Sequence, residues 1–211
     1  MKNSLFPIAK DGWKYLAYAI GAFIVFSILD FSFFQLLSLL VVVFFLFIFR
    51  NPERELPSFE ANQVLSPVDG EVLSIESLDI ADEYAYKVVI NTTYKDVGIL
   101  RAPMNASVEY LRQNHGTRLS LDAPLAHKLN ENVSVVFQNT QDNKMKLIHM
   151  LKQSLCGVHI DLDSKDKVVQ SARYGLMING ITEIYLPKNF RLSLVLGEET
   201  IASKSLIGYF T

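Results

Sequence analysis

The stretch that decides the fold is residues 15–49, which read YLAYAIGAFIVFSILDFSFFQLLSLLVVVFFLFIF. Asp30 is the only charged residue in this run. As one straight helix the run would be about 52 Å long, against a bilayer hydrocarbon core of roughly 30 Å. A carboxylate is costly at the centre of a bilayer but not at its surface. The run therefore predicts a hairpin of two transmembrane helices, at about residues 15–29 and 33–49, that turns at Asp30 and Ser32.

Basic residues flank this run on both sides. Lys10 and Lys14 precede it, and Arg50 and Arg54 follow it. A hairpin places both flanks on one face of the membrane, which the positive-inside rule makes the cytoplasmic face. We therefore expect a protein of the cell (inner) membrane with a membrane anchor at residues 1–50 and its soluble part on the cytoplasmic side. A secretory signal peptide is the alternative, but the bulky residues 39–49 offer no small-residue cleavage site.

The composition excludes several classes of function. The 211 residues carry 20 Lys and Arg against 22 Asp and Glu, so the chain lacks the basic excess of a nucleic-acid-binding protein. Cys156 is the only cysteine, which excludes a disulfide framework. The 4 histidines do not have the spacing of metal ligands. We expect neither a metal nor a nucleic-acid partner, and the sequence leaves the oligomeric state open.

The residues after the apolar run, 51–211, are enough for one soluble domain. Short stretches rich in β-branched residues alternate with turn residues such as Pro67-Val68-Asp69-Gly70. Helical periodicity is weak, and the best case is a short helix at about Met145–Leu155. The pattern predicts a mainly β domain, like a sandwich or barrel, behind the helical hairpin. The predicted strands are 64–65, 71–75, 86–90, 133–137, 183–186 and 191–196.

Five motifs follow the apolar hairpin in a fixed order. They are Phe49-Arg50-Asn51-Pro52-Glu53-Arg54, Ser66-Pro67-Val68-Asp69-Gly70-Glu71-Val72, Asp96-Val97-Gly98-Ile99-Leu100-Arg101-Ala102-Pro103, Asn130-Glu131-Asn132, and the stretch from Arg173-Tyr174-Gly175 to Tyr185-Leu186-Pro187. In this order, and behind this anchor, they resemble the short, membrane-anchored form of phosphatidylserine decarboxylase. The resemblance implies a lyase of phospholipid biosynthesis that makes phosphatidylethanolamine, with a membrane phospholipid as its partner.

The same resemblance supplies a chemical test. Enzymes of this family cut their own backbone before a serine, which becomes a pyruvoyl group that serves as the cofactor. The resemblance places this cut in Asn179-Gly180-Ile181, so that Ile181 stands where the serine should be. Isoleucine has no hydroxyl, so neither the acyl shift nor the elimination can begin there. Gly98 stands at the position of the family histidine, and a glycine side chain transfers no proton.

Two further family positions are retained. Asp69 occupies the place of the processing base, but without a nucleophile it has nothing to activate and is expected to be idle. Arg101 could contact a lipid phosphate or pair with a surface carboxylate. We therefore predict a non-catalytic member of the family, a pseudoenzyme without a cofactor, which binds a membrane phospholipid or accompanies another enzyme of lipid synthesis.

Two alternatives remain open. An active decarboxylase could process at Thr182, Ser203 or Ser205, and would then carry a pyruvoyl or related ketoacyl group. A lipoyl-like β-sandwich scaffold is the other alternative, because such domains share the Pro-Val-Asp-Gly type of turn. That scaffold needs a lysine at the tip of a hairpin, and Lys87 and Lys95 lack such a context.

Overall fold

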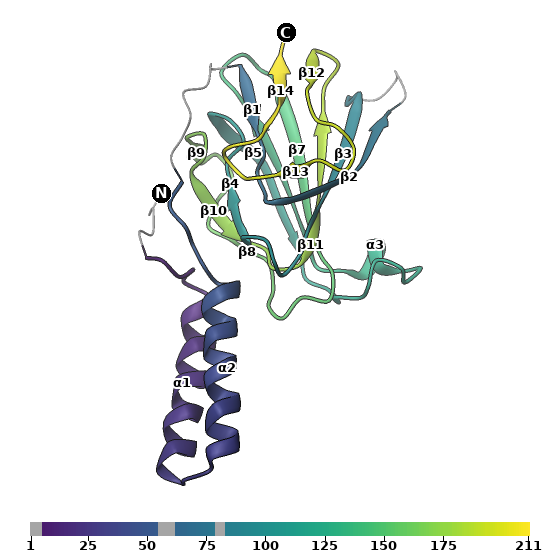
Figure 1. The fold of residues 1–211 in the computed structure, drawn as a ribbon. Coiled ribbons are helices and arrows are strands. Elements are labelled where there is room, and N and C mark those ends of the chain that lie inside the picture. Colours follow the sequence, from purple (N-terminus) through teal and green to yellow (C-terminus); the bar gives the residue numbers. More distant parts are fainter. Residues whose placement is uncertain (1–5, 55–61, 79–82) are drawn as a thin grey trace. The chain divides into compact units, whose positions relative to one another are not determined.

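The computed structural model describes residues 6–54, 62–78 and 83–211 (Figure 1). The chain divides into two compact units, one that ends at residue 53 and one that runs from residue 54 to residue 211. We describe each unit by itself.

The first unit is a helical hairpin. Helix α1 spans Gly12–Ile28 and helix α2 spans Ser32–Ile48. The turn between them contains Asp30, whose φ of 56° is left-handed. Stacked rings join the two helices near both ends of the pair, Phe26 with Phe34 and Tyr15 with Phe49. Large apolar side chains along both helices are exposed.

The predicted transmembrane spans are not supported. Among the residues that the structure describes, none of the helices combines the length and apolar character that crossing a membrane requires. Each arm of the hairpin has 17 residues, which at 1.5 Å per residue gives about 26 Å against a hydrocarbon core of roughly 30 Å. The turn at Asp30 divides the long apolar run into two arms, each shorter than the roughly 20 residues typical of a spanning helix.

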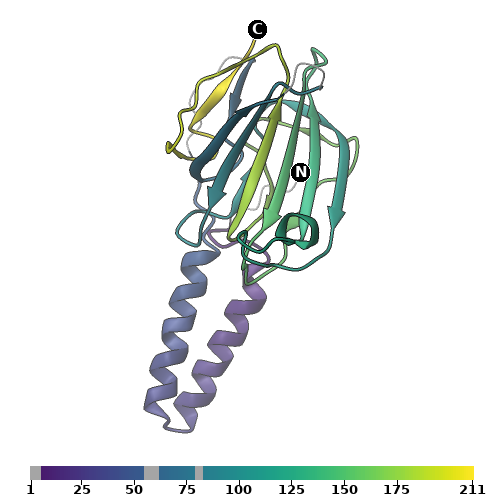
Figure 2. The same cartoon turned by 90° about the vertical axis from the view of Figure 1, so that its right-hand side faces the viewer.

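The second unit is mainly β, as predicted, and is built on an antiparallel sheet of 8 strands that Figure 2 shows beside two smaller sheets. The strand order in this large sheet is β13-β2-β3-β11-β7-β6-β5-β9. The bounds are β2 Gly70–Ser77, β3 Tyr86–Thr92, β5 Ala106–Asn114, β6 Asn132–Gln138, β7 Lys144–Leu151, β9 Lys167–Val168, β11 Gly180–Leu186 and β13 Glu199–Thr200.

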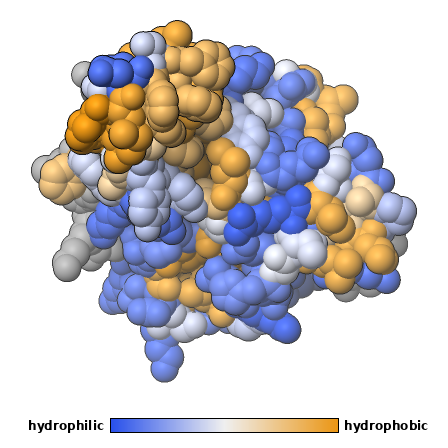
Figure 3. Space-filling view, turned by 90° about the horizontal axis from the view of Figure 1, so that it is seen from below, coloured by the Kyte–Doolittle hydropathy of each residue, from blue (hydrophilic) through white to orange (hydrophobic). Residues whose placement is uncertain are grey.

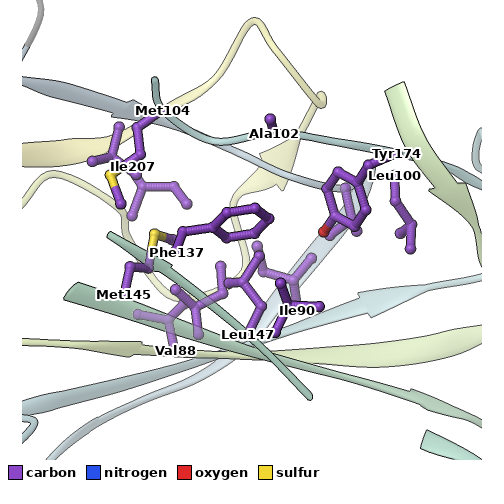
Figure 4. Packing of buried hydrophobic residues seen from close by; sticks show 14 of the residues in the cluster. Val88, Ile90, Leu100, Ala102, Met104, Phe137, Met145, Leu147, Tyr174 and Ile207 are labelled. Atoms are coloured by element: carbon purple, nitrogen blue, oxygen red, sulfur yellow. The ribbon is translucent and has the colours of Figure 1, made fainter. Parts of the chain in front are cut away.

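Two sheets of 3 strands each complete the unit, in the orders β1-β14-β12 and β4-β10-β8. Their bounds are β1 Gln63–Leu65, β4 Ile99–Arg101, β8 His159–Ile160, β10 Arg173–Leu176, β12 Phe190–Leu192 and β14 Leu206–Phe210, and a short helix, α3, spans Ala126–Leu129. The main hydrophobic core joins them to the large sheet. In Figure 4, Leu100, Tyr174 and Ile207 of the small sheets lie near Ile90 and Phe137 of the large one. The domain is therefore a sandwich of sheets around one core.

The predicted helix at about Met145–Leu155 is wrong. Residues 144–151 form β7, which lies between β11 and β6 in the large sheet. Met145, Leu147, His149 and Leu151 are all fully buried and alternate with less buried neighbours, which is the period of a strand. Lys144 and Lys146 follow this alternation, but the half-buried Ile148 and the buried His149 break it in the sequence.

The other predicted strands fare better. Those at 64–65, 71–75, 86–90, 133–137 and 183–186 lie within observed strands, whereas the one predicted at 191–196 ends at Leu192. The register of β11 then positions the residues of interest. Ile181 lies opposite Asn91 and Met150, and Thr182 lies opposite Ile90 and His149.

Candidate functional site

The position that the resemblance assigns to the cleavage site, which we call the cleavage position, lies at the start of β11. Asn179, with a left-handed φ of 56°, precedes this strand, and Gly180 begins it. Ile181 is 3% exposed and packs with Val89 and Met150 on the face of the large sheet that lies away from the main core. The side chain at the cleavage position is thus a packed hydrocarbon, and it offers no nucleophile.

Thr182 points to the opposite face, into the main core. Its Oγ1 lies 2.8 Å from Nδ1 of His149, and Nε2 of that imidazole lies 2.6 Å from the hydroxyl of Tyr174. All three side chains are fully buried. Burial lowers the pKa of His149 to about 3 and raises the pKa of Tyr174, so both groups are neutral near pH 7. The three residues form a neutral hydrogen-bonded chain across the core.

Gly98 is enclosed by backbone and side chains. A Cβ atom at this position would meet the carbonyl oxygen of Met177 at 2.9 Å and a side-chain carbon of Ile178 at 3.1 Å. The same segment is fixed by a 2.8 Å hydrogen bond from the Met177 N–H to the Gly98 carbonyl. The space that an imidazole would need at this position is therefore filled.

Asp69 is held by a clamp that the sequence did not reveal. Arg54 donates two hydrogen bonds to its carboxylate, one to each oxygen, at 2.7 and 2.6 Å. The N–H of Ala202 donates a third at 2.8 Å, and Arg54 also donates to the Ala202 carbonyl at 2.6 Å. The Arg54 and Asp69 side chains are only 8% and 12% exposed. The carboxylate is therefore engaged in a nearly buried ion pair.

A polar cavity of about 170 Å³ lies beside Asp69. Its lining combines carboxylates, a lysine, an amide and hydroxyls, contributed by Asp69, Gly70, Glu71, Asn91, Thr93, Lys95, Asp96, Glu199, Thr200 and Ile201. Lys152 reaches the same region by donating a hydrogen bond to the Asn91 side chain. Burial lowers the pKa of this lysine, and the charge of Asp96 opposes that shift.

The structure brings together only some of the predicted site residues. Asp69 lines the cavity, while Gly98, Ile181 and Arg101 are not among its lining residues in the part of the chain described. Arg101 is 3% exposed and donates to the carbonyl of Ser171 at 3.4 Å, so its guanidinium faces the interior of the domain. A lipid phosphate cannot reach it in this conformation, and its role as a phosphate contact stays a prediction.

A pyruvoyl group does not fit the residues present at the cleavage position. That group is made from a residue that carries a hydroxyl or thiol, and the side chain of Ile181 is a hydrocarbon packed against Val89 and Met150. The lipoyl-like alternative fits no better. Lys87 lies inside β3, where it pairs with Glu183 at 2.9 Å, and not at the tip of a hairpin. Within the described ranges, no group of three or more His, Cys, Asp or Glu residues could hold a metal ion.

Sequence reasoning missed Arg54, His149 and Tyr174 as parts of this region. Arg54 was noted only as a member of a motif. Its partner, Asp69, is 15 positions away in the sequence, and only the fold brings the two side chains together. His149 stands on a strand that was predicted as a helix. The alternation of buried residues along 145–151 is the signal that could have placed it inside the core.

By its fold, this protein is a β-sandwich domain preceded in the chain by a helical hairpin. Its candidate site is an aspartate, bound by Arg54, beside a polar cavity. Comparison with known proteins then gives its family. The family model described as phosphatidylserine decarboxylase matches residues 41–208. The chain therefore belongs to the phosphatidylserine decarboxylase family.

Relatives along the whole chain agree. A phosphatidylserine decarboxylase proenzyme of Geotalea uraniireducens is 29% identical over 215 residues, which covers 99% of each chain. The one of Cupriavidus metallidurans is 29% identical over 211 residues, or 95% of this chain and 94% of that one. The one of Desulfotalea psychrophila is 26% identical over 206 residues, or 96% of each chain.

Proposed function

We propose that this chain is a non-catalytic, membrane-attached member of the family that serves phospholipid metabolism without processing itself. The single observation that carries the proposal is the side chain at the cleavage position. Ile181 has no hydroxyl, and it is buried in an apolar cluster rather than exposed beside a catalytic group. Without an attacking oxygen, the acyl shift that begins processing has no first step.

Two neighbouring features support the same proposal. Gly98 brings no proton-transfer group, and the atoms around it leave no room for one. Asp69 keeps the position of the processing base, but both of its oxygens accept hydrogen bonds from Arg54. The contacts of this carboxylate are thus with Arg54 and the Ala202 N–H, and not with the cleavage position. The three positions thus lack a nucleophile, a proton carrier and a free base.

The helical hairpin supports membrane attachment. Its exposed side chains include Phe, Ile, Leu and Val along both α1 and α2, which water does not favour. We propose that the hairpin inserts into the bilayer from one side without crossing it. The basic residues that flank the hairpin support the proposal that this side is the cytoplasmic face of the cell (inner) membrane. The cavity beside Asp69 is then the proposed place for a phospholipid head group.

A second candidate function, self-processing at Thr182, is favoured by one observation. The Thr182 hydroxyl lies 2.8 Å from an imidazole nitrogen of His149, the arrangement of a nucleophile and its base. It ranks second because the peptide before Thr182 lies in β11, which has a strand on each side. The residue is also fully buried, so the water that turns the eliminated residue into a ketoacyl group has no access to it.

Self-processing at Ser203 instead of Thr182 is favoured by a separate observation. Its Oγ is buried and has no hydrogen-bond partner in the described part of the chain, and its φ of 65° is left-handed. The carbonyl of Ala202 before it accepts a hydrogen bond from Arg54 at 2.6 Å, which polarises that carbonyl. Ser205 differs, because its Oγ already accepts the Ile201 N–H at 2.9 Å.

The intact mass of the purified full-length protein decides between these candidates. We expect one uncleaved chain and no decarboxylation of phosphatidylserine, with the proenzyme of Geotalea uraniireducens as the positive control for both measurements. A C-terminal fragment of residues 182–211 or 203–211, blocked by a ketoacyl group, would instead establish processing at Thr182 or Ser203. Because threonine carries one more carbon than serine, the fragment's mass also identifies the residue that was converted.

A further inference from the structure

Lys152 is a half-buried lysine at the end of the large sheet where β7 stops and β11 begins. Its side chain donates a hydrogen bond to the amide oxygen of Asn91. In the described part of the chain it forms no ion pair, whereas Lys87 and Lys144 each pair with a glutamate. Figure 3 shows this end of the β domain, where hydrophilic side chains (blue) lie among apolar ones. The head of Lys152 thus meets a neutral partner instead of a carboxylate.

The backbone at Lys152 is fixed by hydrogen bonds. Its N–H donates to the carbonyl of Asn179 at 3.1 Å. The next residue, Gln153, has a left-handed φ of 41°, and its carbonyl accepts the Tyr94 hydroxyl at 2.6 Å and the Asn179 amide at 3.3 Å. A residue other than glycine adopts this conformation rarely, and only where its surroundings hold it there. The base of the lysine side chain is therefore held in place.

Two residues that line the polar cavity beside Asp69 also interact with Lys152. Asn91 accepts its hydrogen bond, and Asp96 acts on its amine by charge. The head of the lysine therefore lies at the edge of this cavity, whose volume is about 170 Å³. A cavity of about 150 Å³ holds a molecule the size of benzene. The site is thus large enough for a small organic ligand and too small for a bulky one.

The amine of Lys152 is easier to deprotonate than that of an ion-paired lysine. Burial lowers the pKa of Lys152, although the charge of Asp96 opposes this shift. The hydrogen bond and the charge of Glu109 instead raise the pKa of Lys144. A lysine attacks an electrophile only as the neutral amine, and it forms a Schiff base with a carbonyl carbon. The position and the pKa of Lys152 therefore both favour reaction with a carbonyl compound.

The charges around the cavity favour an uncharged carbonyl compound over a keto acid. Four carboxylates line it, those of Asp69, Glu71, Asp96 and Glu199. Asp69 is paired with Arg54. The other cations at the cavity are Lys95 and Lys152, and Lys152 loses its charge when its amine becomes neutral. The carboxylates are then in excess, so a ligand that carries a carboxylate would be repelled.

We propose that the Lys152 amine forms a Schiff base with a small, uncharged aldehyde held in the polar cavity. The amine nitrogen attacks the carbonyl carbon, and the carbonyl oxygen leaves as water with one proton from the amine and one from solvent. The product is a protonated imine, and the reaction needs neither an oxidant nor a reductant. This reaction goes beyond the function proposed above and does not depend on it, although a lipid head group would compete for the same cavity.

Reductive trapping tests this reaction in the full-length protein in detergent. Propanal is added with cyanoborohydride in excess, so that attack by the amine limits the rate, and peptide mapping by mass spectrometry follows the propyl amine formed at each lysine. At pH 8 we expect Lys152 to react at least about threefold faster than Lys87, a half-buried lysine that is paired with Glu183. Asp96→Asn should increase the rate at Lys152, because it removes the charge that favours the ammonium. Diphenylacetaldehyde, which is too bulky for the cavity, should show no preference for Lys152.

Reaction of Lys152 no faster than that of Lys87 would overturn the proposal. A preference for Lys152 that persists with diphenylacetaldehyde would overturn it as well, because the reactivity would then not depend on the cavity. A slower reaction of Lys152 in Asp96→Asn, with the rate at Lys87 unchanged, would show that the neutral amine is not the reacting form and would have the same consequence.

Discussion

The buried imidazole of His149 makes the stability of the β domain depend on pH in a predictable way. Its pKa is lowered from 6.5 to about 3 in the folded protein because burial disfavours its charged form. The groups that face it are the neutral hydroxyls of Thr182 and Tyr174. In the unfolded chain the imidazole takes up a proton near its ordinary pKa of about 6.5. Between these two values the unfolded state binds one more proton than the folded state.

The sign and size of the effect follow from this difference. A group whose pKa is depressed by folding contributes stability above its unfolded pKa and loses it as the pH falls. The free energy of unfolding should therefore decrease by about 1.4 kcal/mol per pH unit through the window between pH 6.5 and pH 3. Lowering the pH from 7 to 4.5 should remove about 2.5 kcal/mol, a large part of the 5–15 kcal/mol that is usual for a domain.

Urea unfolding of residues 54–211, followed by circular dichroism at a series of pH values, measures this loss. Other groups also titrate below pH 5, so His149→Gln is the reference, because an amide of similar size does not titrate. We expect His149→Gln to be less stable at pH 7 by about 1–3 kcal/mol, for the hydrogen bonds it loses. Relative to His149→Gln, the free energy of unfolding of the unmodified protein should then fall by about 2.5 kcal/mol between pH 7 and pH 4.5. Parallel curves over this range would refute a neutral buried imidazole.

Three further predictions concern the cleavage position, the clamp and the hairpin. Ile181→Ser alone should leave the chain intact by mass, and adding Gly98→His should destabilise the domain by about 1–3 kcal/mol in urea, because the new side chain meets packed atoms. Arg54→Met should destabilise the domain by about 3–5 kcal/mol in the same assay, because Asp69 would remain as an uncompensated, nearly buried charge. Deletion of residues 1–53 should move the protein from the membrane pellet to the soluble fraction, because it removes α1 and α2 with their exposed apolar side chains.

Matched controls sharpen these measurements. Lys144→Met removes an exposed ion pair with Glu109 and should change the stability by less than about 1 kcal/mol. A similar loss in Lys144→Met and Arg54→Met would contradict the argument from burial. Efficient cleavage of Ile181→Ser would show that Gly98 is not needed for processing. Retention of the truncated protein in the membrane pellet would mean that the β domain binds lipid by itself.

Much of the fold could be predicted because its signals are local. Strands such as β3 and β11 are predicted by runs of β-branched residues between turns. Pro67–Gly70 is one turn of this kind. The apolar run at 15–49 predicts helices, but a helix's ability to span depends on where the turn falls. The strand β5 went unrecognised because most of its side chains are half-buried or exposed, so no clean alternation appears in its sequence.

The candidate site was less predictable because its contacts are distant in sequence. Arg54 and Asp69 are separated by 15 positions, and Arg54 and Ala202 by 148. The hydrogen bond of His149 to Thr182 joins neighbouring strands of the large sheet, and the one to Tyr174 joins two different sheets. Only the pairing of the strands brings such groups together. What the sequence did supply was the identity of Ile181 and Gly98, because the absence of a functional group is visible without a structure.

The closed surroundings of Gly98 have a consequence for the history of this chain. The carbonyl of Met177 and the side chain of Ile178 occupy the volume that a larger residue would take. Under the function proposed above, a serine at position 181 would confer no advantage by itself, and a histidine at position 98 would first destabilise the fold. Neither change alone would therefore bring the chain closer to catalysis. The packing around Gly98 would then oppose a return to catalysis more strongly than the two missing side chains alone.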